Sequence, residues 1–350
     1  RDIGVTGVQT CALPISQPVL DEPGLVEMLQ LRAARLQCAR VFPLGALTQG
    51  LAGDNLSAMA ELTQAGCVGF SQAEAGVSHT QILQRAMQYA ATYGYVLWMR
   101  AQDAFLGKGV AASGPIATRL GLSGVPVAAE TIALHTLIDV MRSTGARLHL
   151  CRLSSAAGVA LLRQAKSEGL PVTADVSIHQ LHFTDNDVGY FDTRARLNPP
   201  LRQSQDRDAL RAALADGTID VLVSDHTPVL GDAKDLPFAQ AEPGASALEM
   251  LLSATLKWAE QSGVSRMRAL QVVTCEPAKL LGESAEGLGR LDVGCPADVC
   301  VLNPSIQWQV ATSSLHSQSK HTPFAFAMSG SQMPGKVKAT LVGGRVVYQA

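Results

Sequence analysis

The sequence predicts an α/β fold, a TIM-type (β/α)8 barrel with a small β module beside it. Strand-like and helix-like segments alternate along most of the chain, which is typical of a parallel sheet with right-handed crossovers. After about residue 281, only strand and turn signals remain. With 350 residues, of which 47% are hydrophobic and 17% are charged, the chain can bury a core of this size.

The alternation gives six strand-then-helix units. The expected strands lie at 39–44, 66–71, 95–100, 147–153, 171–177 and at the start of 219–228. The expected helices lie at 22–36, 55–65, 79–92, 128–144, 156–168, 204–215, 247–262 and 266–273. Because the chain looks cut at its front, we expect an eight-stranded barrel whose first two strands are missing. A doubly wound open sheet is the alternative, but no Gly-rich phosphate loop supports it.

Three regions are expected along the chain. Residues 1–15 (RDIGVTGVQTCALPI) lack an initiator Met and the features of a signal peptide, and they resemble a translated sequencing adapter. We therefore set them aside as an artefact. Residues 16–280 would form the truncated barrel. Residues 281–350 would form the C-terminal part of a β-sandwich module, including a hairpin at 338–348 that turns at Gly343-Gly344.

Composition excludes several classes of partner and site. The formal net charge is −2 and no basic block is present, so neither nucleic acid nor an anionic membrane is expected as a partner. No apolar run reaches the roughly 18 residues of a membrane span. The 7 cysteines form no CxxC pair, which argues against a disulfide framework or a zinc ribbon and favours a cytoplasmic location.

The most informative stretch is 219–228, IDVLVSDHTP. An apolar, β-branched run leads directly into polar residues. Polar residues at the carboxyl end of a buried parallel strand lie where barrel enzymes place their chemistry. Asp225 is therefore the first candidate for a catalytic residue, as a general base.

Several segments together resemble the dihydroorotase branch of the amidohydrolase superfamily. They are 18–21 (PVLD), 45–48 (GALT), 197–202 (LNPPLR), 220–228, 237–244, 321–324 (HTPF) and the Gly-x-Leu-x-x-Gly-x-x-Ala-Asp pattern at 289–298. The resemblance covers the chain from residue 17 onward and implies a metallo-dependent hydrolase barrel. In that family, two zinc ions activate the water that opens the cyclic amide of dihydroorotate. The ligands are an HxH pair, a bridging Asp, two single His residues and a final Asp.

Matching these positions one by one leaves an incomplete zinc site. The HxH strand would lie before residue 17 and is absent from this sequence. The family's His-x-Glu-Asp becomes Arg100-Ala101-Gln102-Asp103, which keeps only the expected bridging ligand, Asp103. Arg152 and Gln180 stand where the single ligand histidines belong. Asp225 is kept as ligand and general base.

The substrate contacts implied by the resemblance are also reduced. Asn198 is kept as a vestigial substrate contact, whereas a contact His is replaced by Val229. Strand alternation predicts that His149 and His179 face away from the pocket, so they would not replace the missing ligands. A shifted register that turns His149 and Cys151 inward is the alternative.

Each surviving polar residue also has a structural interpretation. Asp225 and Asp103 would pair with Arg152 or Arg100 in a buried ion network, because buried charges are usually paired. His226 would be a hydrogen-bonded residue at the barrel mouth. Gly244 would serve at most as a loop hinge. The remaining cysteines of interest would fill the core: Cys67, Cys151 and Cys300.

The preferred hypothesis is a dihydroorotase-like protein of pyrimidine synthesis that has lost its zinc site. It would need no cofactor and would support the catalytic chains of aspartate carbamoyltransferase in an oligomeric complex. One alternative is an active dihydroorotase or related cyclic amidohydrolase, with a single zinc held by the missing HxH pair and Asp225. A small-molecule binding protein without chemistry is a third possibility.

Overall fold

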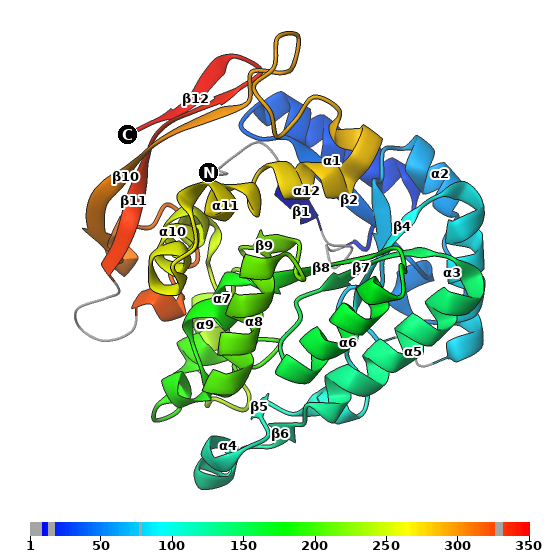
Figure 1. Cartoon of the computed structure of the whole chain (residues 1–350), viewed down its shortest axis with the longest axis horizontal. Coiled ribbons are helices and arrows are strands. Elements are labelled where there is room, and N and C mark those ends of the chain that lie inside the picture. The colour runs from blue at the N-terminus through cyan, green and yellow to red at the C-terminus, as the bar shows by residue number, and fades with distance from the viewer. Residues whose placement is uncertain (1–8, 13–17, 77–78, 326–331) are drawn as a thin grey trace.

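The computed structural model describes residues 9–12, 18–76, 79–325 and 332–350 (Figure 1). Its main sheet has seven strands in the order β1-β2-β3-β4-β7-β8-β9, and every neighbouring pair is parallel. The strands are β1 Gln9–Ala12, β2 Val41–Ala46, β3 Gly69–Ser71, β4 Val96–Arg100, β7 Arg147–Cys151, β8 Val172–Ser177 and β9 Val221–Val223. This confirms the predicted parallel α/β architecture. The structure also places β1 inside the segment that was set aside as an artefact.

Helices between the strands cover one face of this sheet. They are α1 Pro23–Leu36, α2 Met59–Gln64, α3 Thr80–Tyr93, α5 Ala128–Thr144, α6 Ala156–Ser167 and α8 Ser204–Asp216. In α3, the buried side chains follow helical spacing: Leu83, Ala86, Met87 and Ala90. Gly94 ends α3 at φ +71°, a left-handed conformation that glycine adopts without a steric cost.

The two faces of the sheet have different chemistry. The helix-covered face carries the large apolar core, including Leu97, Leu148 and Leu150 next to helix residues such as Leu134 and Leu162. Alternate residues of the same strands point to the other face, which we call the inner face. A smaller apolar cluster there joins Leu44, Trp98 and part-buried Cys151 to α12, Cys275–Leu281. The polar residues of interest lie above this cluster, toward the strand ends.

Short elements complete the barrel region. The strands β5 Ala111–Ala112 and β6 Gly124–Val125 pair with each other, on either side of α4 Pro115–Leu120. The later helices are α7 Ile178–His182, α9 Gly231–Lys234, α10 Leu251–Ser262 and α11 Arg266–Gln271. The prediction for His179 rests on strand alternation, but this residue lies in helix α7. The helix begins after Ser177, because Ser177 Oγ accepts a hydrogen bond from the His179 amide.

The β module is a three-stranded antiparallel sheet, drawn in orange and red at the edge of the molecule (Figure 1). Its strands are β10 Val299–Gln309, β11 Gln332–Val342 and β12 Arg345–Gln349, and Gly343-Gly344 forms the expected turn between the last two. Asp298 ties the module to the barrel by accepting hydrogen bonds from Arg40, at 2.5 and 3.1 Å, and from the Gly343 amide. Among the described residues, no helix is long and apolar enough to cross a membrane.

Candidate functional site at the strand ends

Polar side chains converge at the carboxyl ends of the parallel strands. Arg100 is the last residue of β4, Arg152 follows β7 directly, and Asp225 lies two residues after β9. Glu74 comes from the loop after β3, and Asn198 comes from the loop that precedes α8. Because the strands are parallel, their carboxyl ends lie on one edge of the sheet and bring these five residues together.

The five residues form one hydrogen-bonded ion network. Arg152 Nη1 donates to Asp225 Oδ1 and to the Asn198 carbonyl, both at 3.2 Å. Glu74 forms ion pairs with both Arg100 and Arg152. Asn198 links the two sides, because its amide nitrogen donates to Glu74 Oε2 at 2.8 Å and its side-chain oxygen accepts from Arg100 Nη2 at 2.5 Å. The predicted pairing of Asp225 with Arg152 is confirmed.

Most of this network is withdrawn from water. The side chains of Arg100, Arg152 and Asp225 are 6%, 9% and 11% exposed, and that of Glu74 is 34% exposed. Burial and then repulsion from Arg152 lower the pKa of Arg100 well below its ordinary value. Two guanidinium groups face two carboxylates, so each buried charge has an opposite partner.

The backbone of the site departs from regular strand geometry. Arg152 has φ +56° and Asp225 has φ +50°, a left-handed conformation that side chains other than glycine rarely adopt. Such outliers cluster at functional sites and persist only where the surroundings hold them. The Arg152 amide is held by Asp175 Oδ1 at 2.7 Å.

This backbone corrects the prediction that His149 faces away from the site region. The prediction extended strand alternation through Arg152, but β7 ends at Cys151 and the left-handed residue breaks the alternation. His149 lies on the inner face, where its ring packs against Trp98 with the centroids 4.3 Å apart. It also contacts Thr173 and Asp175 of β8, each at 2.9 Å.

The other predicted site residues lie outside the ion network. The predicted pairing of Asp103 with Arg152 or Arg100 is wrong, because these arginines pair with Glu74 and Asp225. The Asp103 carboxylate instead accepts from the backbone amides of Phe105 and Leu106, at 2.9 and 2.8 Å, and so caps a turn. Gln180 donates to the carbonyls of Pro199 and Pro200, at 3.1 and 3.2 Å, and holds the loop that carries Asn198. Val229 is buried.

The two histidines near the barrel mouth have different surroundings. His179 is buried against Phe324, with neither ring nitrogen hydrogen-bonded, and burial lowers its pKa to about 4. His226 Nδ1 accepts from the backbone amides of Ala247 and Leu248, at 3.1 and 3.3 Å. This agrees with the prediction that His226 is a hydrogen-bonded residue.

Sequence reasoning missed Glu74 and Asp175, although both carried a usable signal. Glu74 follows β3 as Asp225 follows β9, so the rule that drew attention to Asp225 applies to it as well. Asp175 is a charged residue inside an otherwise buried strand, and it is 3% exposed. A carboxylate in such a position needs partners.

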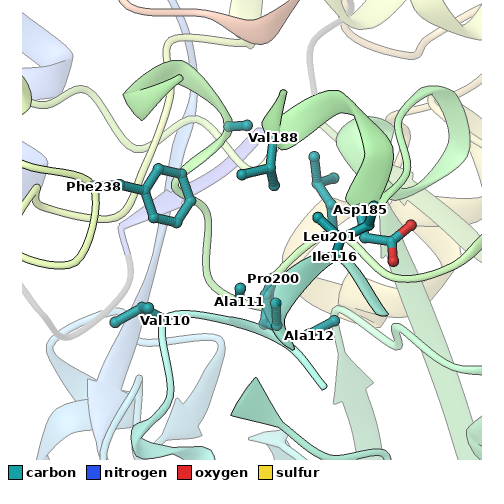
Figure 2. Close-up of a pocket in the computed structure, with 11 residues that line it drawn as sticks. Val110, Ala111, Ala112, Ile116, Asp185, Val188, Pro200, Leu201 and Phe238 are labelled. Atoms are coloured by element: carbon teal, nitrogen blue, oxygen red, sulfur yellow. The ribbon is translucent and has the colours of Figure 1, made fainter. Parts of the chain in front are cut away.

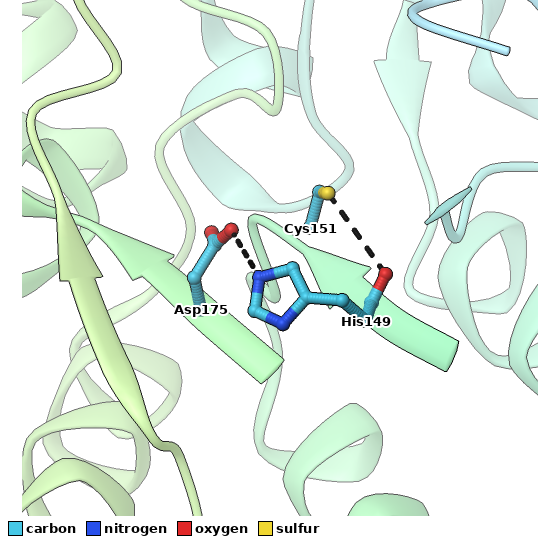
Figure 3. Close-up of side chains that lie close together, drawn as sticks. All are labelled: His149, Cys151 and Asp175. Carbon is cyan, nitrogen blue, oxygen red and sulfur yellow. Dashed lines mark hydrogen bonds and ion pairs between the residues drawn. The ribbon is translucent and has the colours of Figure 1, made fainter. Parts of the chain in front are cut away.

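One group of potential metal ligands occurs in the described part of the chain. It consists of His149, Cys151 and Asp175, whose ligand atoms all lie within 4.8 Å of one another (Figure 3). Burial and then Asp175 raise the pKa of the Cys151 thiol well above its ordinary value. Asp103 and Asp225 belong to no group of three or more ligands among these residues.

A small cavity beside the loop at 198–201 is lined mainly by apolar side chains (Figure 2). Pro200 and Leu201 face Val110, Val188 and Phe238 across it, and Asp185 is its one charged residue. Its volume of about 10 Å³ is close to the space of a single water molecule. It is therefore a packing gap and too small for an organic substrate.

Comparison with known proteins shows to which family this chain belongs. The profile of the amidohydrolase family matches residues 116–348, and that of the dihydro-orotase-like family matches residues 3–157. A protein of Anaeromyxobacter dehalogenans named dihydroorotase is 38% identical over 349 residues, covering 99% of this chain and 78% of that protein. The chain belongs to the amidohydrolase family, on its dihydroorotase-like branch.

Two further relatives of this family match nearly the whole chain. A protein of Pseudomonas aeruginosa named dihydroorotase-like protein is 38% identical, covering 97% of this chain and 78% of that protein. The solved structure of an L-hydantoinase (dihydropyrimidinase) from Arthrobacter aurescens superimposes with a TM-score of 0.86 at 25% identity, covering 99% of this chain and 79% of that one. The fold is therefore a TIM-type amidohydrolase barrel.

The residues at the strand ends do not fit the metal centre on which this family normally depends. Two of the side chains that meet there are guanidinium groups, which stay protonated and cannot bind a cation. The carboxylate of Asp225 is already engaged by Arg152.

Proposed function

We propose that this chain is a non-catalytic member of the dihydroorotase-like branch, with a structural role in pyrimidine synthesis. The observation that carries the proposal is the pair of arginines at the strand ends. Arg100 and Arg152 stand where the resemblance expects histidines, and both are paired with Glu74. The region that should generate a metal-bound hydroxide is instead a closed ion network.

Electrostatics supports the loss of zinc chemistry. Two unit charges about 4 Å apart interact by about 4 kcal/mol at an effective dielectric constant of 20. A divalent ion beside the Arg152 guanidinium would therefore meet a repulsion of about 8 kcal/mol, before any relaxation. Arginine cannot escape this cost by losing its proton at neutral pH. Without a metal, a water molecule at Asp225 keeps a pKa near that of bulk water.

The proposed partner is the catalytic chain of aspartate carbamoyltransferase, in an oligomeric complex in the cytoplasm. This part of the proposal rests on the resemblance to degenerate dihydroorotase-like proteins and on the four substitutions that occur together: Arg100, Arg152, Gln180 and Val229. The barrel and the β module would act as a scaffold, without nucleic acid or membrane as a further partner.

Co-purification tests the partner. The full chain and the aspartate carbamoyltransferase chain from the same genome are co-expressed, with a tag on only one of them. We expect a complex of fixed stoichiometry on size-exclusion chromatography with light scattering. An active dihydroorotase of the same family, tagged in the same way, is the control for nonspecific association of the barrel with the partner chain. Separate elution of the two chains at micromolar concentration would contradict the proposal.

An active zinc-dependent dihydroorotase is the second candidate, because relatives at 38% identity carry that name. In this case, a single zinc would be held by an HxH pair and Asp225. The genomic codons that precede codon 17 discriminate the two. A His-x-His there, combined with zinc-dependent hydrolysis of dihydroorotate to N-carbamoyl-aspartate, would support the enzyme and contradict the proposal.

A further inference from the structure

Three different ligand types meet on the inner face of the sheet, below the ion network. His149 and Cys151 are alternate residues of β7, and Asp175 comes from the neighbouring strand β8. Their side chains gather between the two strands (Figure 3). Strands are rigid supports, so the positions of these groups are fixed by the sheet rather than by loop conformation.

The distances suit a small divalent ion after a modest adjustment. One ligand atom from each residue lies within 4.8 Å of the other two, and His149 Nε2 is 2.9 Å from Asp175 Oδ2. Tetrahedral zinc, with bonds of about 2.0 to 2.3 Å, separates its ligand atoms by about 3.3 to 3.8 Å. The His–Asp pair would open slightly and the cysteine sulfur would move inward by about 1 Å.

The partners of the ligands already orient them. His149 Nδ1 contacts Thr173 Oγ1 at 2.9 Å, which leaves Nε2 on the side of the carboxylate. Asp175 Oδ1 accepts the Arg152 amide at 2.7 Å, which leaves Oδ2 toward the histidine. Hydrogen bonds of this kind, on the far atom of each ligand, are the usual second contact of metal-binding His and carboxylate side chains.

The charges of Arg152 and Arg100 reach this group, since both favour the thiolate form of Cys151. The Arg152 guanidinium is engaged by Glu74 and Asp225, and only its backbone amide faces Asp175. The Cys151 thiol would release its proton when the metal binds, and the resulting thiolate and the Asp175 carboxylate would supply two negative charges that balance a divalent ion.

We propose that His149, Cys151 and Asp175 form a binding site for a divalent transition metal such as zinc. Mixed nitrogen, sulfur and oxygen ligands select a borderline-soft ion rather than magnesium or calcium. Three protein ligands leave the fourth tetrahedral position to water. The ion would join β7 to β8 and would lie outside the set of positions at which the family resemblance places zinc.

Cobalt titration of the purified full chain tests this site, because Co²⁺ reports thiolate ligation through a charge-transfer absorption band. We expect one Co²⁺ per chain, with that band, displaced by Zn²⁺. Cys151→Ser should remove the band and weaken binding at least about tenfold. Thr173→Val keeps the side-chain shape, removes the contact to His149 and should weaken binding by about ten- to a hundredfold.

Two matched variants separate this site from the others. Cys67→Ala removes a buried cysteine elsewhere in the core and Asp216→Asn removes an exposed carboxylate, and neither should change the band or the stoichiometry. Circular dichroism confirms that each variant is folded. Absence of cobalt binding by the folded wild-type chain, an intact band in Cys151→Ser, or loss of the band in Cys67→Ala would each overturn the proposal.

Discussion

At the scale of single residues, Arg152 connects the ion network to the sheet. Its guanidinium pairs with Asp225 and Glu74, its backbone amide binds Asp175, and its left-handed backbone ends β7. A histidine at this position could bind zinc only as a neutral imidazole. An arginine instead neutralises the carboxylate that the metal would need. Arg152 is therefore the residue on which the proposed loss of hydrolysis depends most directly.

The Arg152–Asp225 pair should contribute strongly to stability. Arg152→Met leaves a nearly buried carboxylate without its partner and should lower the free energy of unfolding by about 3 kcal/mol. Asp225→Asn should cost less, because no carboxylate charge remains. The double variant should be more stable than the sum of the single losses predicts, measured by urea denaturation as a double-mutant cycle.

An exposed pair supplies the control for this cycle. Arg163 and Asp216 are 50% and 49% exposed and 2.6 Å apart. Their cycle should give a coupling energy of at most about 1 kcal/mol. Equal coupling energies for the buried and the exposed pair would show that the strand-end network is not held together by its charges.

Residue-level prediction succeeded where a charge needed a partner and failed where the backbone was irregular. The pairing of Asp225 with Arg152 follows from the general cost of an unpaired buried charge. The inward position of His149 was only the alternative prediction, because strand alternation gives no warning of a left-handed residue at 152. Asp103, Asp225 and Asn198 as vestigial site residues stay predictions, and Asp103 caps a turn in this structure.

At the scale of elements, helix α7 is a short buried segment that holds neutral histidines. His179 and His182 lie on it, and burial lowers their pKa values to about 4 and about 3. His182 Nε2 bonds to the Ala254 carbonyl at 2.9 Å, which joins α7 to α10. The helix thus docks the strand ends against the segment that leads to the β module.

These histidines predict acid sensitivity. In the unfolded chain the pKa of these histidines is about 6.5. Below that pH, the unfolded state therefore binds more protons than the folded state, which destabilises the fold. Stability should therefore be complete above pH 6.5 and fall as the pH approaches 4, by up to about 1.4 kcal/mol per pH unit for each histidine. Urea denaturation at several pH values measures the slope.

A variant isolates this contribution from that of the carboxylates. His182→Gln keeps a hydrogen-bond donor for Ala254 and removes one titrating group. Between pH 6 and 4, its free energy of unfolding should fall less steeply with pH than that of the wild type. The difference between the two slopes should correspond to about one titrating histidine. Identical slopes for the two proteins would contradict a neutral, buried His182.

The loop before α10 depends on one glycine. Gly244 has φ +139°, and a Cβ atom there would lie 2.6 Å from the Thr227 carbonyl oxygen, two residues from Asp225. Gly244→Ala should therefore lower stability by about 2 to 3 kcal/mol, measured by thermal and urea unfolding. Gly121→Ala, at φ +65° with open space around it, should cost only about 1 to 2 kcal/mol. Equal losses would contradict close packing of this loop.

Sequence periodicity located long elements better than short ones. Helix α5 has the predicted bounds and α1 differs by one residue. Gly145 follows α5, and the polar residues Glu22 and Gln37 flank α1. Strand β3 is shorter than predicted, since Gly66 turns at φ +111°. Helix α7 has five residues, too few for helical periodicity to register.

At the scale of the whole molecule, the barrel keeps the family architecture and carries an ion network at its strand ends. The parallel order of the seven strands follows from strict strand–helix alternation, so this part could be predicted. Strand β1 could not, because the sequence of residues 1–15 resembles an adapter and predicts no strand. The complete ion network could not be predicted either, because its members come from five separate segments of the sequence.

The absence of hydrolysis is the central claim at this scale, and one measurement tests it most directly. Purified full-length protein with saturating zinc is assayed for turnover of dihydroorotate to N-carbamoyl-aspartate, beside Asp225→Asn. We predict that the wild type shows no turnover above that of the variant, because Arg100 and Arg152 occupy the strand ends and pair with Glu74. Zinc-dependent turnover by the wild type that Asp225→Asn abolishes would contradict the account.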